Sequence, residues 1–571
     1  MSKFADFRTG EGPLNDSQQV WHLYGEGLES LKQDPQAMPA YGPDDVLARI
    51  DACGLCFSDV KVIRQGGGHP RLFNRDLASD PVILGHEVAL TVVGVGANMA
   101  GQYAVGQRFV VQAEIYYQGK NLAFGYMLPG GLEQYVTLSN EVLRGDDGCY
   151  LIPVHADTGY AEAALAEPWA CVVRAYRDTR RKSLKPGGKA WIIGTAAGEK
   201  LSYGLSGMDV SSLPAEIVLT NCPASFAGAV QTMASVTSIK LTTADGADLP
   251  AIAAAQAPDG FDEIFVLGGD AAAIQAVAPL LGKEGVLSIV TEGGLDQAIE
   301  IDVGRVHYDA LQYVATSPGR PLGGYQPPRA VKLQQDGQCW ICGAGGPMGQ
   351  MHVQLAIEAS DGPRTVVCTD IDTDRLNRIP IRFGEAAQRR GCKLVLLNPK
   401  ELGDQFEAEL RKVAPDGFDD VVCLVPVPAI ISQCSRFVGK RGVYNIFAGV
   451  GRGTMAQMDL DKVIGNNARW FGSSGSFIDD LKMTLSLAER GELSPNMAVA
   501  AIGGIEAVRD GLQAVSESAM PGKIVIYPHI ANLPLTTLPD LHEKMPEVAA
   551  KLGPDDTWTR EAEEALLEGL L

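Results

Sequence analysis

The sequence predicts an α/β protein in which two tandem doubly wound parallel-sheet domains follow a smaller β domain. Three observations predict this class. Part of the chain is repeated with alternating β and α patterns, the second repeat contains a glycine-rich turn between a strand and a helix, and the N-terminal part combines β patterning with cysteine and histidine. At 571 residues, the chain is long enough for about three or four domains of usual size.

Composition and charge describe a folded protein that is not expected to bind nucleic acid or a membrane surface. Hydrophobic residues make up 46% of the chain and charged residues 20%, as in soluble globular proteins. The net charge of −21 repels phosphate backbones and anionic lipid, so we expect no nucleic acid and no membrane as partner. No leader pattern or long apolar run is present, which favours the cytoplasm. The 11 scattered cysteines predict reduced thiols rather than disulfides.

The internal repeat is visible without gaps. The segment 257–262 recurs at 414–419, an offset of 157 residues that also carries 282–286 onto 439–443. Upstream the offset is 149, carrying Trp191 onto Trp340. The two copies span about 188–325 and 337–480. Each alternates short apolar runs with helical stretches and glycine-rich turns, which predicts a parallel sheet covered by helices on both faces.

The second copy begins with a candidate nucleotide-binding turn. The apolar run 339–342 leads into Gly343-Ala-Gly-Gly-Pro-Met-Gly349 and a helical stretch, so backbone could approach a pyrophosphate at a helix N-terminus. Asp370, 21 residues after Gly349, would accept from a ribose 2′-hydroxyl and repel a 2′-phosphate. NAD is therefore predicted rather than NADP, although the glycine register is imperfect and a tight turn without ligand is the alternative. The predicted cofactor contacts are Gly343, Gly345, Gly346, Pro347, Met348, Gly349 and Asp370.

The first copy has lost these features. Its turn, Gly194-Thr-Ala-Ala-Gly-Glu199-Lys200, ends in lysine instead of glycine and places Glu199 where phosphate would lie. Asn221 stands in place of the acid. We therefore expect a degenerate domain that binds no dinucleotide in the usual way, although Lys200 could serve a different ligand.

The N-terminal β region carries a candidate metal site. Alternating strands are predicted over 46–50, 88–93, 108–112 and 134–138. Between them lie Cys53-Gly-Leu-Cys56-Phe-Ser58-Asp59 and Gly85-His86-Glu87. A thiolate, an imidazole and a carboxylate from separate loops are the ligands of a catalytic zinc. Each of the two segments alone has a plainer interpretation. The two cysteines could be a redox pair or packed thiols, and the Gly-His-Glu segment could be an ordinary loop.

The cysteine motif and the Gly-His-Glu motif occur in this order, ahead of a dinucleotide-binding fold. In this arrangement the sequence resembles the medium-chain, zinc-dependent alcohol and polyol dehydrogenases. The matching motifs are Gly54-Leu-Cys56-Phe-Ser58-Asp59, Gly85-His86-Glu87 and Glu167-Pro168, and the segments 473–477 and 521–528 look like the closing strands of the family. The stretches 117–126 and 130–135 look particularly like sorbose 1-phosphate reductases, a sugar-phosphate branch.

The resemblance implies a GroES-like β-barrel catalytic domain and a site for one zinc ion. Cys56, His86 and Glu167 would be the zinc ligands, with Glu87 as a close neighbour or exchanging ligand, and the choice between Glu87 and Glu167 stays open. Ser58 would relay the proton of the substrate. No cysteine lies between Cys56 and Cys149, so the four-cysteine lobe that holds a structural zinc in the family is absent.

Four segments are predicted from these observations. Residues 1–187 would form the catalytic domain, 188–330 the degenerate copy, 331–500 the NAD-binding copy, and 501–571 a return to the catalytic domain with a helical tail. Family members commonly dimerise by pairing the outer strands of two nucleotide domains. The corresponding strands here, 310–314 and 468–471, belong to one chain, so we expect an internal pseudo-dimer; a homo-oligomer is not excluded.

For several residues a functional and a purely structural interpretation both stay open. Cys53 is expected to be a packed thiol rather than a ligand. His69 could face substrate or lie in a surface loop. Lys120, Asn121 and Glu114 could contact a polar substrate or be ordinary surface residues.

The predicted function is hydride transfer between NAD(H) and a secondary alcohol or ketone of a polyol, sugar or sugar phosphate. Zinc would lower the pKa of the substrate hydroxyl, and the nicotinamide would take the hydride. Two other functions stay open: an NAD-retaining lyase or epimerase that acts through transient oxidation, and a non-catalytic binding protein on the same fold.

Overall fold

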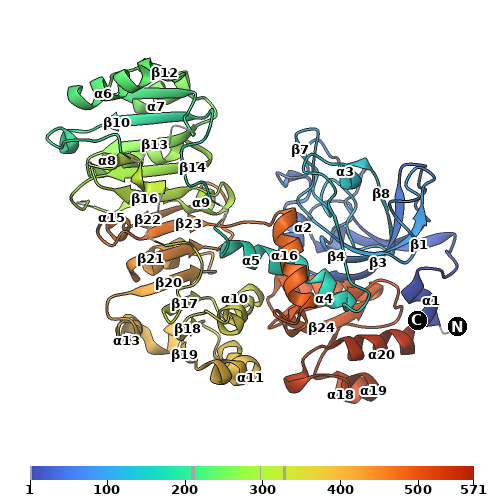
Figure 1. The fold of residues 1–571 in the computed structure, drawn as a ribbon. Helices are drawn as coiled ribbons and strands as arrows, with labels where there is room; N and C mark the ends of the chain where they lie inside the picture. Colours follow the sequence, from blue (N-terminus) through green and yellow to red (C-terminus); the bar gives the residue numbers. More distant parts are fainter. Residues whose placement is uncertain (1–2, 179, 207–211, 296, 326–328) are drawn as a thin grey trace. The chain divides into compact units, whose positions relative to one another are not determined.

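The computed structural model describes residues 3–178, 180–206, 212–295, 297–325 and 329–571. The chain forms two compact units (Figure 1). The first contains residues 1–173, 346–351 and 475–571, and the second contains 174–345 and 352–474. The chain thus returns to the first unit at Gly475, earlier than the boundary expected at 500.

The first unit is built on an eight-stranded sheet whose long central strands are β3 (Val46–Gly54) and β4 (Glu87–Val95). The four strands predicted from alternation are present, the other two being β5 (Arg108–Val111) and β8 (Tyr135–Leu138). The C-terminal segment adds strands to this sheet, because β25 pairs antiparallel with β3. The remaining strands of the unit are β1 (Ser17–Leu23), β2 (Leu31–Ala37), β6 (Tyr116–Tyr117), β7 (Lys120–Asn121), β9 (Leu151–Pro153), β24 (Val499–Gly504), β25 (Lys523–Tyr527) and β26 (Thr536–Thr537).

Helices complete the first unit. The predicted helical tail is present, and α20 docks through Glu563, which accepts hydrogen bonds from the Tyr160 and Ala161 backbone and from the Tyr527 hydroxyl. The helices of the unit are α1 (Lys3–Thr9), α2 (Phe57–Gln65), α3 (Asn140–Leu143), α4 (Tyr160–Ala164), α5 (Ala166–Ala175), α16 (Ile478–Glu489), α17 (Val508–Ser516), α18 (Leu541–Lys544), α19 (Pro546–Ala549) and α20 (Arg560–Leu570).

A buried carboxyl group makes the first unit sensitive to pH. Gln18 Nε2 donates to Glu133 Oε2 at 3.0 Å, while Glu133 Oε1 is buried without a partner. Burial raises the pKa of Glu133 to about 8. The native state therefore keeps a proton that the unfolded chain releases above about pH 4.5, so the free energy of unfolding falls as the pH rises from about 4.5 to about 8.

Glu133→Gln is expected to remove this loss of stability at high pH. The amide still accepts from Gln18 but cannot ionise, so the variant should be more stable than wild type at pH 8 and similar at pH 5. Each pKa unit corresponds to about 1.4 kcal/mol, which sets the gain at a few kcal/mol at most. Denaturant unfolding at the two pH values measures it, and equal wild-type and variant stabilities at pH 8 would contradict the assignment.

The second unit is one continuous twelve-stranded sheet. Its first half has the order β12-β11-β10-β13-β14-β16 and its second half the order β19-β18-β17-β20-β21-β23. Numbered within each half, both orders are 3-2-1-4-5-6, the arrangement of a doubly wound dinucleotide fold. The strands are β10 (Lys189–Gly194), β11 (Glu216–Thr220), β12 (Lys240–Thr243), β13 (Phe261–Leu267), β14 (Leu281–Val290), β16 (Gln312–Thr316), β17 (Gln338–Cys342), β18 (Thr365–Thr369), β19 (Lys393–Leu397), β20 (Phe418–Cys423), β21 (Val438–Ile446) and β23 (Arg469–Gly472). The predicted α/β class and the repeat are confirmed.

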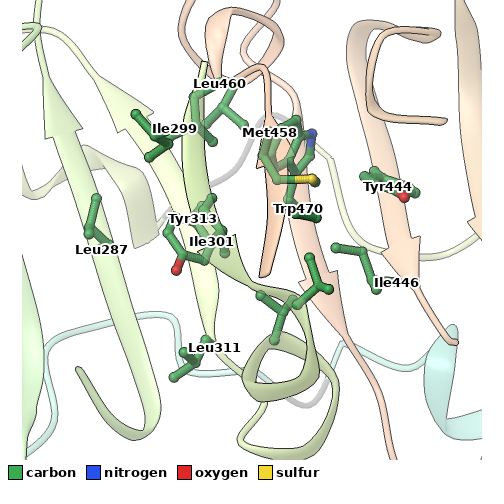
Figure 2. Close-up of a cluster of buried hydrophobic side chains, with 14 of the residues drawn as sticks. Leu287, Ile299, Ile301, Leu311, Tyr313, Tyr444, Ile446, Met458, Leu460 and Trp470 are labelled. Carbon is green, nitrogen blue, oxygen red and sulfur yellow. The ribbon is translucent and has the colours of Figure 1, made fainter. Parts of the chain in front are cut away.

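The two halves join at the strands expected from the repeat. Within each half the paired strands are parallel, whereas β16 and β23 pair antiparallel, with Gln312 opposite Phe471 and Tyr313 opposite Trp470. A second antiparallel pair, β15 (Ile299–Asp302) with β22 (Met455–Met458), crosses the same seam. Figure 2 shows Ile299, Ile301, Met458 and Trp470 in the apolar core that covers one face of the seam.

The two halves differ where a dinucleotide would bind. In the second half, α10 (Pro347–Glu358) follows β17 directly, as predicted. In the first half, the described residues between β10 and β11 form only the short 3-10 turn Ala196–Gly198. The first half therefore lacks, over that described stretch, the helix N-terminus that would receive a phosphate. The remaining helices are α6 (Ala224–Ser235), α7 (Leu249–Gln256), α8 (Ala271–Val277), α9 (Val303–Tyr308), α11 (Thr373–Arg390), α12 (Pro399–Leu402), α13 (Phe406–Val413), α14 (Pro428–Ser435) and α15 (Asp461–Gly465).

No helix in the described ranges is both long and apolar enough to cross a membrane. All 11 cysteines are free thiols, as the sequence predicted.

Candidate active site

The predicted metal-binding cysteine begins a helix. Cys56 follows β3 and is the N-cap of α2, where its Sγ accepts from the Ser58 backbone N–H at 3.5 Å. Asp59 completes the cap by accepting from the Cys56 N–H at 2.9 Å. Cys56 Sγ therefore lies at the positive end of the helix dipole. Ser58 lies in the first turn and is half-buried.

His86 and Glu87 are brought to the same point by β4. His86 directly precedes the strand and Glu87 is its first residue. The ligand atoms of Cys56, His86 and Glu87 all lie within 4.8 Å of one another. His86 Nδ1 is 3.4 Å from Asp59 Oδ1. Burial disfavours the protonated imidazole, but the nearby Asp59 and Cys56 outweigh it and raise the pKa of His86 well above its ordinary value.

A buried lysine neutralises Glu87. Lys523 Nζ, from the first residue of β25, donates to Glu87 Oε1 at 2.5 Å, and the two side chains are 6% and 0% exposed. Burial acts to lower the pKa of Lys523, and the charges of Glu87 and Cys56 overcome it and raise that pKa. Glu87 Oε2 keeps no hydrogen-bond partner although it is buried. The carboxylate therefore has one oxygen fixed by lysine and one oxygen free to bind a cation.

Glu167 lies on α5 in the same buried region but outside the close group formed by Cys56, His86 and Glu87. Burial raises the pKa of Glu167 to about 7, while the nearby His86 acts to lower it. Cys171, one turn further along α5, is also buried. The structure thus groups Glu87, not Glu167, with the cysteine and histidine.

The donor set suits zinc. Sulfur, imidazole nitrogen and carboxylate oxygen are its usual protein ligands, and the orphaned Glu87 Oε2 beside them is a buried acceptor that needs a proton or a cation. Cys53 is not part of the group. Its thiol is fully buried and lies against Gly85 and Gly131, which agrees with a packed thiol.

Four residues with polar side chains lie beside this group and are called the polar wall here: Arg71, Glu114, Asn121 and Tyr126. Tyr126 lies with its ring centroid 6.0 Å from that of His86, and the Arg71 guanidinium lies 4.7 Å from the Tyr126 ring. Glu114 pairs with Arg71 and accepts from Asn121 Nδ2 at 2.8 Å. Burial alone would raise the pKa of Glu114, but Arg71 lowers it. Glu114 and Asn121, two of the candidate substrate residues, therefore belong to one hydrogen-bonded group, whereas Lys120 is exposed.

His69 lies next to the same wall. Its ring is 5.7 Å from Tyr126, centroid to centroid, and burial lowers its pKa to about 4. A neutral imidazole at neutral pH can donate or accept a hydrogen bond. Arg71 and Tyr126 were not singled out from the sequence, since neither belongs to a metal-type motif.

At two positions of the candidate cofactor turn, the backbone of the second unit requires glycine. Gly343 has a φ of +85°. A Cβ at Gly345 would lie 2.7 Å from Arg375 Cβ and 2.8 Å from Asp370 Oδ2. Asp370 Oδ2 accepts from the Gly345 N–H at 3.0 Å, and Oδ1 accepts from Asp372 N–H at 3.1 Å. Asp370 thus fixes the turn, and each oxygen keeps a lone pair that a ribose hydroxyl could use.

A second cysteine group lies in the core of the second unit. The sulfur atoms of Cys342, Cys423 and Cys434 are within 4.8 Å of one another and buried. The offsets of the repeat put Ile193, Val266 and Val277 at the corresponding places of the first half, all buried. Since aliphatic side chains fill these places in one copy, packing explains the thiols in the other.

Comparison with known proteins gives the family of the chain. The profile of the alcohol dehydrogenase GroES-like domain matches residues 42–144. The L-sorbose 1-phosphate reductase of Klebsiella pneumoniae is 30% identical over 314 residues, covering 52% of this chain and 74% of that protein.

The chain belongs to the medium-chain, zinc-dependent alcohol and polyol dehydrogenases. It is thus an oxidoreductase of the alcohol dehydrogenase type, as the sequence predicted. The mannitol-1-phosphate 5-dehydrogenase of Aliivibrio fischeri is 23% identical to this dehydrogenase over 93% of both chains, a span that includes the inserted first copy. The 2R,3R-butanediol dehydrogenase structure from Bacillus subtilis, at 17% identity and a TM-score of 0.50, covers 90% of this chain and 100% of its own and shares the fold.

Proposed function

We propose that this dehydrogenase transfers hydride between NAD(H) and a secondary alcohol or ketone of a polyol or sugar phosphate, with one zinc ion per chain. The observation that carries the proposal is the convergence of Cys56, His86 and Glu87 within 4.8 Å. Cys56 and His86 would hold zinc together with Glu87 or Glu167. When bound, zinc would supply the Lewis acidity that lowers the pKa of a substrate hydroxyl.

The protein residues have separate tasks. Asp59 fixes both the Cys56 backbone and the loop before His86, since it also accepts from the Gly85 N–H at 3.2 Å. Lys523 holds Glu87 through one oxygen. Ser58, half-buried in the first turn of α2, would carry the substrate proton outward.

The substrate class is proposed from the polar wall. Glu114 and Asn121 offer an acceptor and an amide to a chain of hydroxyls, and Arg71 places a cation close to them. The sorbose 1-phosphate and mannitol 1-phosphate enzymes among the relatives support a phosphorylated substrate. A simple alcohol would use none of these groups.

The test is cofactor reduction by the zinc-loaded protein over polyols, their 1-phosphates and simple alcohols, with NAD and with NADP. NAD-linked activity with a higher kcat/KM for the phosphate ester than for the free polyol is expected. Zinc-containing protein that reduces neither cofactor with any of these substrates would overturn the proposal.

Cofactor preference is proposed to depend on Asp370. Asp370→Asn keeps an acceptor for the Gly345 N–H but removes the charge, whereas Asp370→Ala removes both. We expect Asp370→Asn to lower the preference for NAD over NADP by about ten-fold or more, since roughly 1.4 kcal/mol corresponds to that factor. The ratio of kcat/KM values measures it; an unchanged ratio in Asp370→Asn would contradict the role, and Asp370→Ala reports the added cost of a loosened turn.

The seam of the twelve-stranded sheet is proposed to take the place of a subunit interface. The antiparallel pairing of β16 with β23 supports this, because it satisfies two sheet edges within one chain. A mass measurement that finds dimers joined through β23 would contradict it.

A further inference from the structure

The loop between α2 and β4 holds a histidine to which the proposed oxidation gives no task. His69 follows the 3-10 turn Gly66–Gly68 and is half-buried. Its backbone is held on both sides, because its N–H donates to the Gly66 carbonyl at 3.1 Å and its carbonyl accepts from the Leu72 N–H at 2.9 Å. The loop itself therefore keeps His69 in one place.

The side chain of His69 has one nitrogen in use and one available. Nδ1 accepts from the Arg71 backbone N–H at 3.3 Å. Burial lowers the pKa of His69 to about 4, so the ring is neutral at neutral pH, and an accepting Nδ1 places its hydrogen on Nε2. Within the parts of the chain that the structure describes, Nε2 has no hydrogen-bond partner. His69 thus presents a neutral N–H donor in a fixed tautomer.

The ring of His69 lies beside the polar wall. Its centroid is 5.7 Å from that of Tyr126, and the Tyr126 centroid is 6.0 Å from that of His86. Tyr126 is itself fixed, because Arg75 Nη1 donates to its carbonyl at 2.8 Å. One aromatic ring therefore separates His69 from the metal-binding histidine. This separation suits a polyol chain that reacts near His86 and reaches His69 with its end.

The charges around this donor favour an anion. Arg71 and Lys61 both act to lower the pKa of His69, so each contributes a positive potential at the ring. Arg71 is already engaged, since it pairs with Glu114 and lies 4.7 Å from the Tyr126 ring centroid. It acts on His69 through its charge, and the donor that meets the ligand is Nε2.

We propose that His69 Nε2 donates to the phosphate group of the substrate, which makes His69 a specificity-determining residue for phosphorylated polyols. The inference rests on the proposed function and deepens it, and all its residues belong to the first unit. A hydrogen bond to a charged acceptor is about twice as strong as one between neutral groups. The same donor therefore gains more from a phosphate than from the terminal hydroxyl of a free polyol.

Two variants separate this role from a merely structural one. His69→Asn keeps an acceptor at the place of Nδ1 for the Arg71 N–H but removes the donor. His69→Gln keeps an N–H near the place of Nε2 but removes the acceptor. His155→Asn is the matched control, because it removes an imidazole of the same unit whose side chain is 77% exposed.

The full-length, zinc-loaded protein is assayed with NAD and the 1-phosphates of sorbitol, mannitol and arabitol, each against its free polyol. Calorimetric titration of the same esters at saturating NADH measures binding without turnover. We expect His69→Asn to lower the ratio of kcat/KM for ester over polyol at least ten-fold and to weaken ester binding to match. His69→Gln should keep most of the preference for the ester, and His155→Asn should keep all of it.

The opposite order of the two variants would overturn the inference. An unchanged ratio in His69→Asn with a lowered ratio in His69→Gln would mean that His69 only holds its loop. A wild type that oxidises esters and free polyols equally well would also overturn it while leaving the oxidation itself intact. A wild type without activity on any of them would overturn the proposed function and this inference together. If His69→Asn does not fold, His69→Asp keeps the acceptor, replaces the donor by a negative charge and should lower the ratio further.

Discussion

Cys56→Ser is expected to lose its zinc and at least about 1,000-fold in kcat/KM, which corresponds to roughly 4 kcal/mol of transition-state stabilisation. Serine keeps an oxygen at the N-cap of α2, so the helix should form. The fold and NAD binding should therefore survive, because the cofactor turn belongs to a different part of the chain. Metal analysis, circular dichroism and steady-state rates measure the three properties.

Cys53→Ala is the matched control for this experiment. Cys53 lies three residues before Cys56 and is fully buried, but its thiol is outside the metal group. The control should keep its zinc and most of its activity while losing some stability. A Cys56→Ser protein with full activity and no bound metal would contradict the role assigned to the group.

Lys523→Met is expected to destabilise the first unit by about 3–5 kcal/mol, the usual cost of removing one partner of a buried ion pair. Methionine fills much of the lysine volume, so the loss would report charge rather than packing. Glu87 would be left buried without its counter-charge, next to Cys56. Denaturant unfolding of wild type and variant at pH 7 measures the difference.

The double variant Lys523→Met, Glu87→Gln separates charge from shape. Because the amide needs no counter-charge, it should recover a large part of the stability lost in the single variant. If Lys523→Met unfolds like wild type, or if the double variant is as unstable as the sum of the single variants, the ion pair is not what stabilises this region.

The fold was predictable because its signals are local or repeated. The recurrence of 257–262 at 414–419 located both halves of the large sheet, and the run 339–342 before the glycines located β17 and α10. The seam was predicted from 310–314 and 468–471, and the structure pairs these segments as β16 and β23. Their pairing follows from the same edge strand occurring twice in one chain.

The site was only partly predictable because its remaining members are distant in sequence. Lys523 lies 436 residues from Glu87, and the strand pairing between β25 and β3 brings its segment to the metal group. Arg71 lies in a loop without periodicity and is placed by its contacts with Glu114 and Tyr126. The return of the chain to the first unit at Gly475 was also not predicted from the sequence.

The most direct test follows the transferred hydrogen. The zinc-loaded protein is incubated with NAD and a sugar alcohol phosphate deuterated at its secondary carbon, and the cofactor is analysed by mass spectrometry. The account predicts stoichiometric accumulation of reduced NAD carrying deuterium, together with the ketone. Conversion of the substrate with no net reduced cofactor would contradict it and would point to a lyase or epimerase that keeps its NAD.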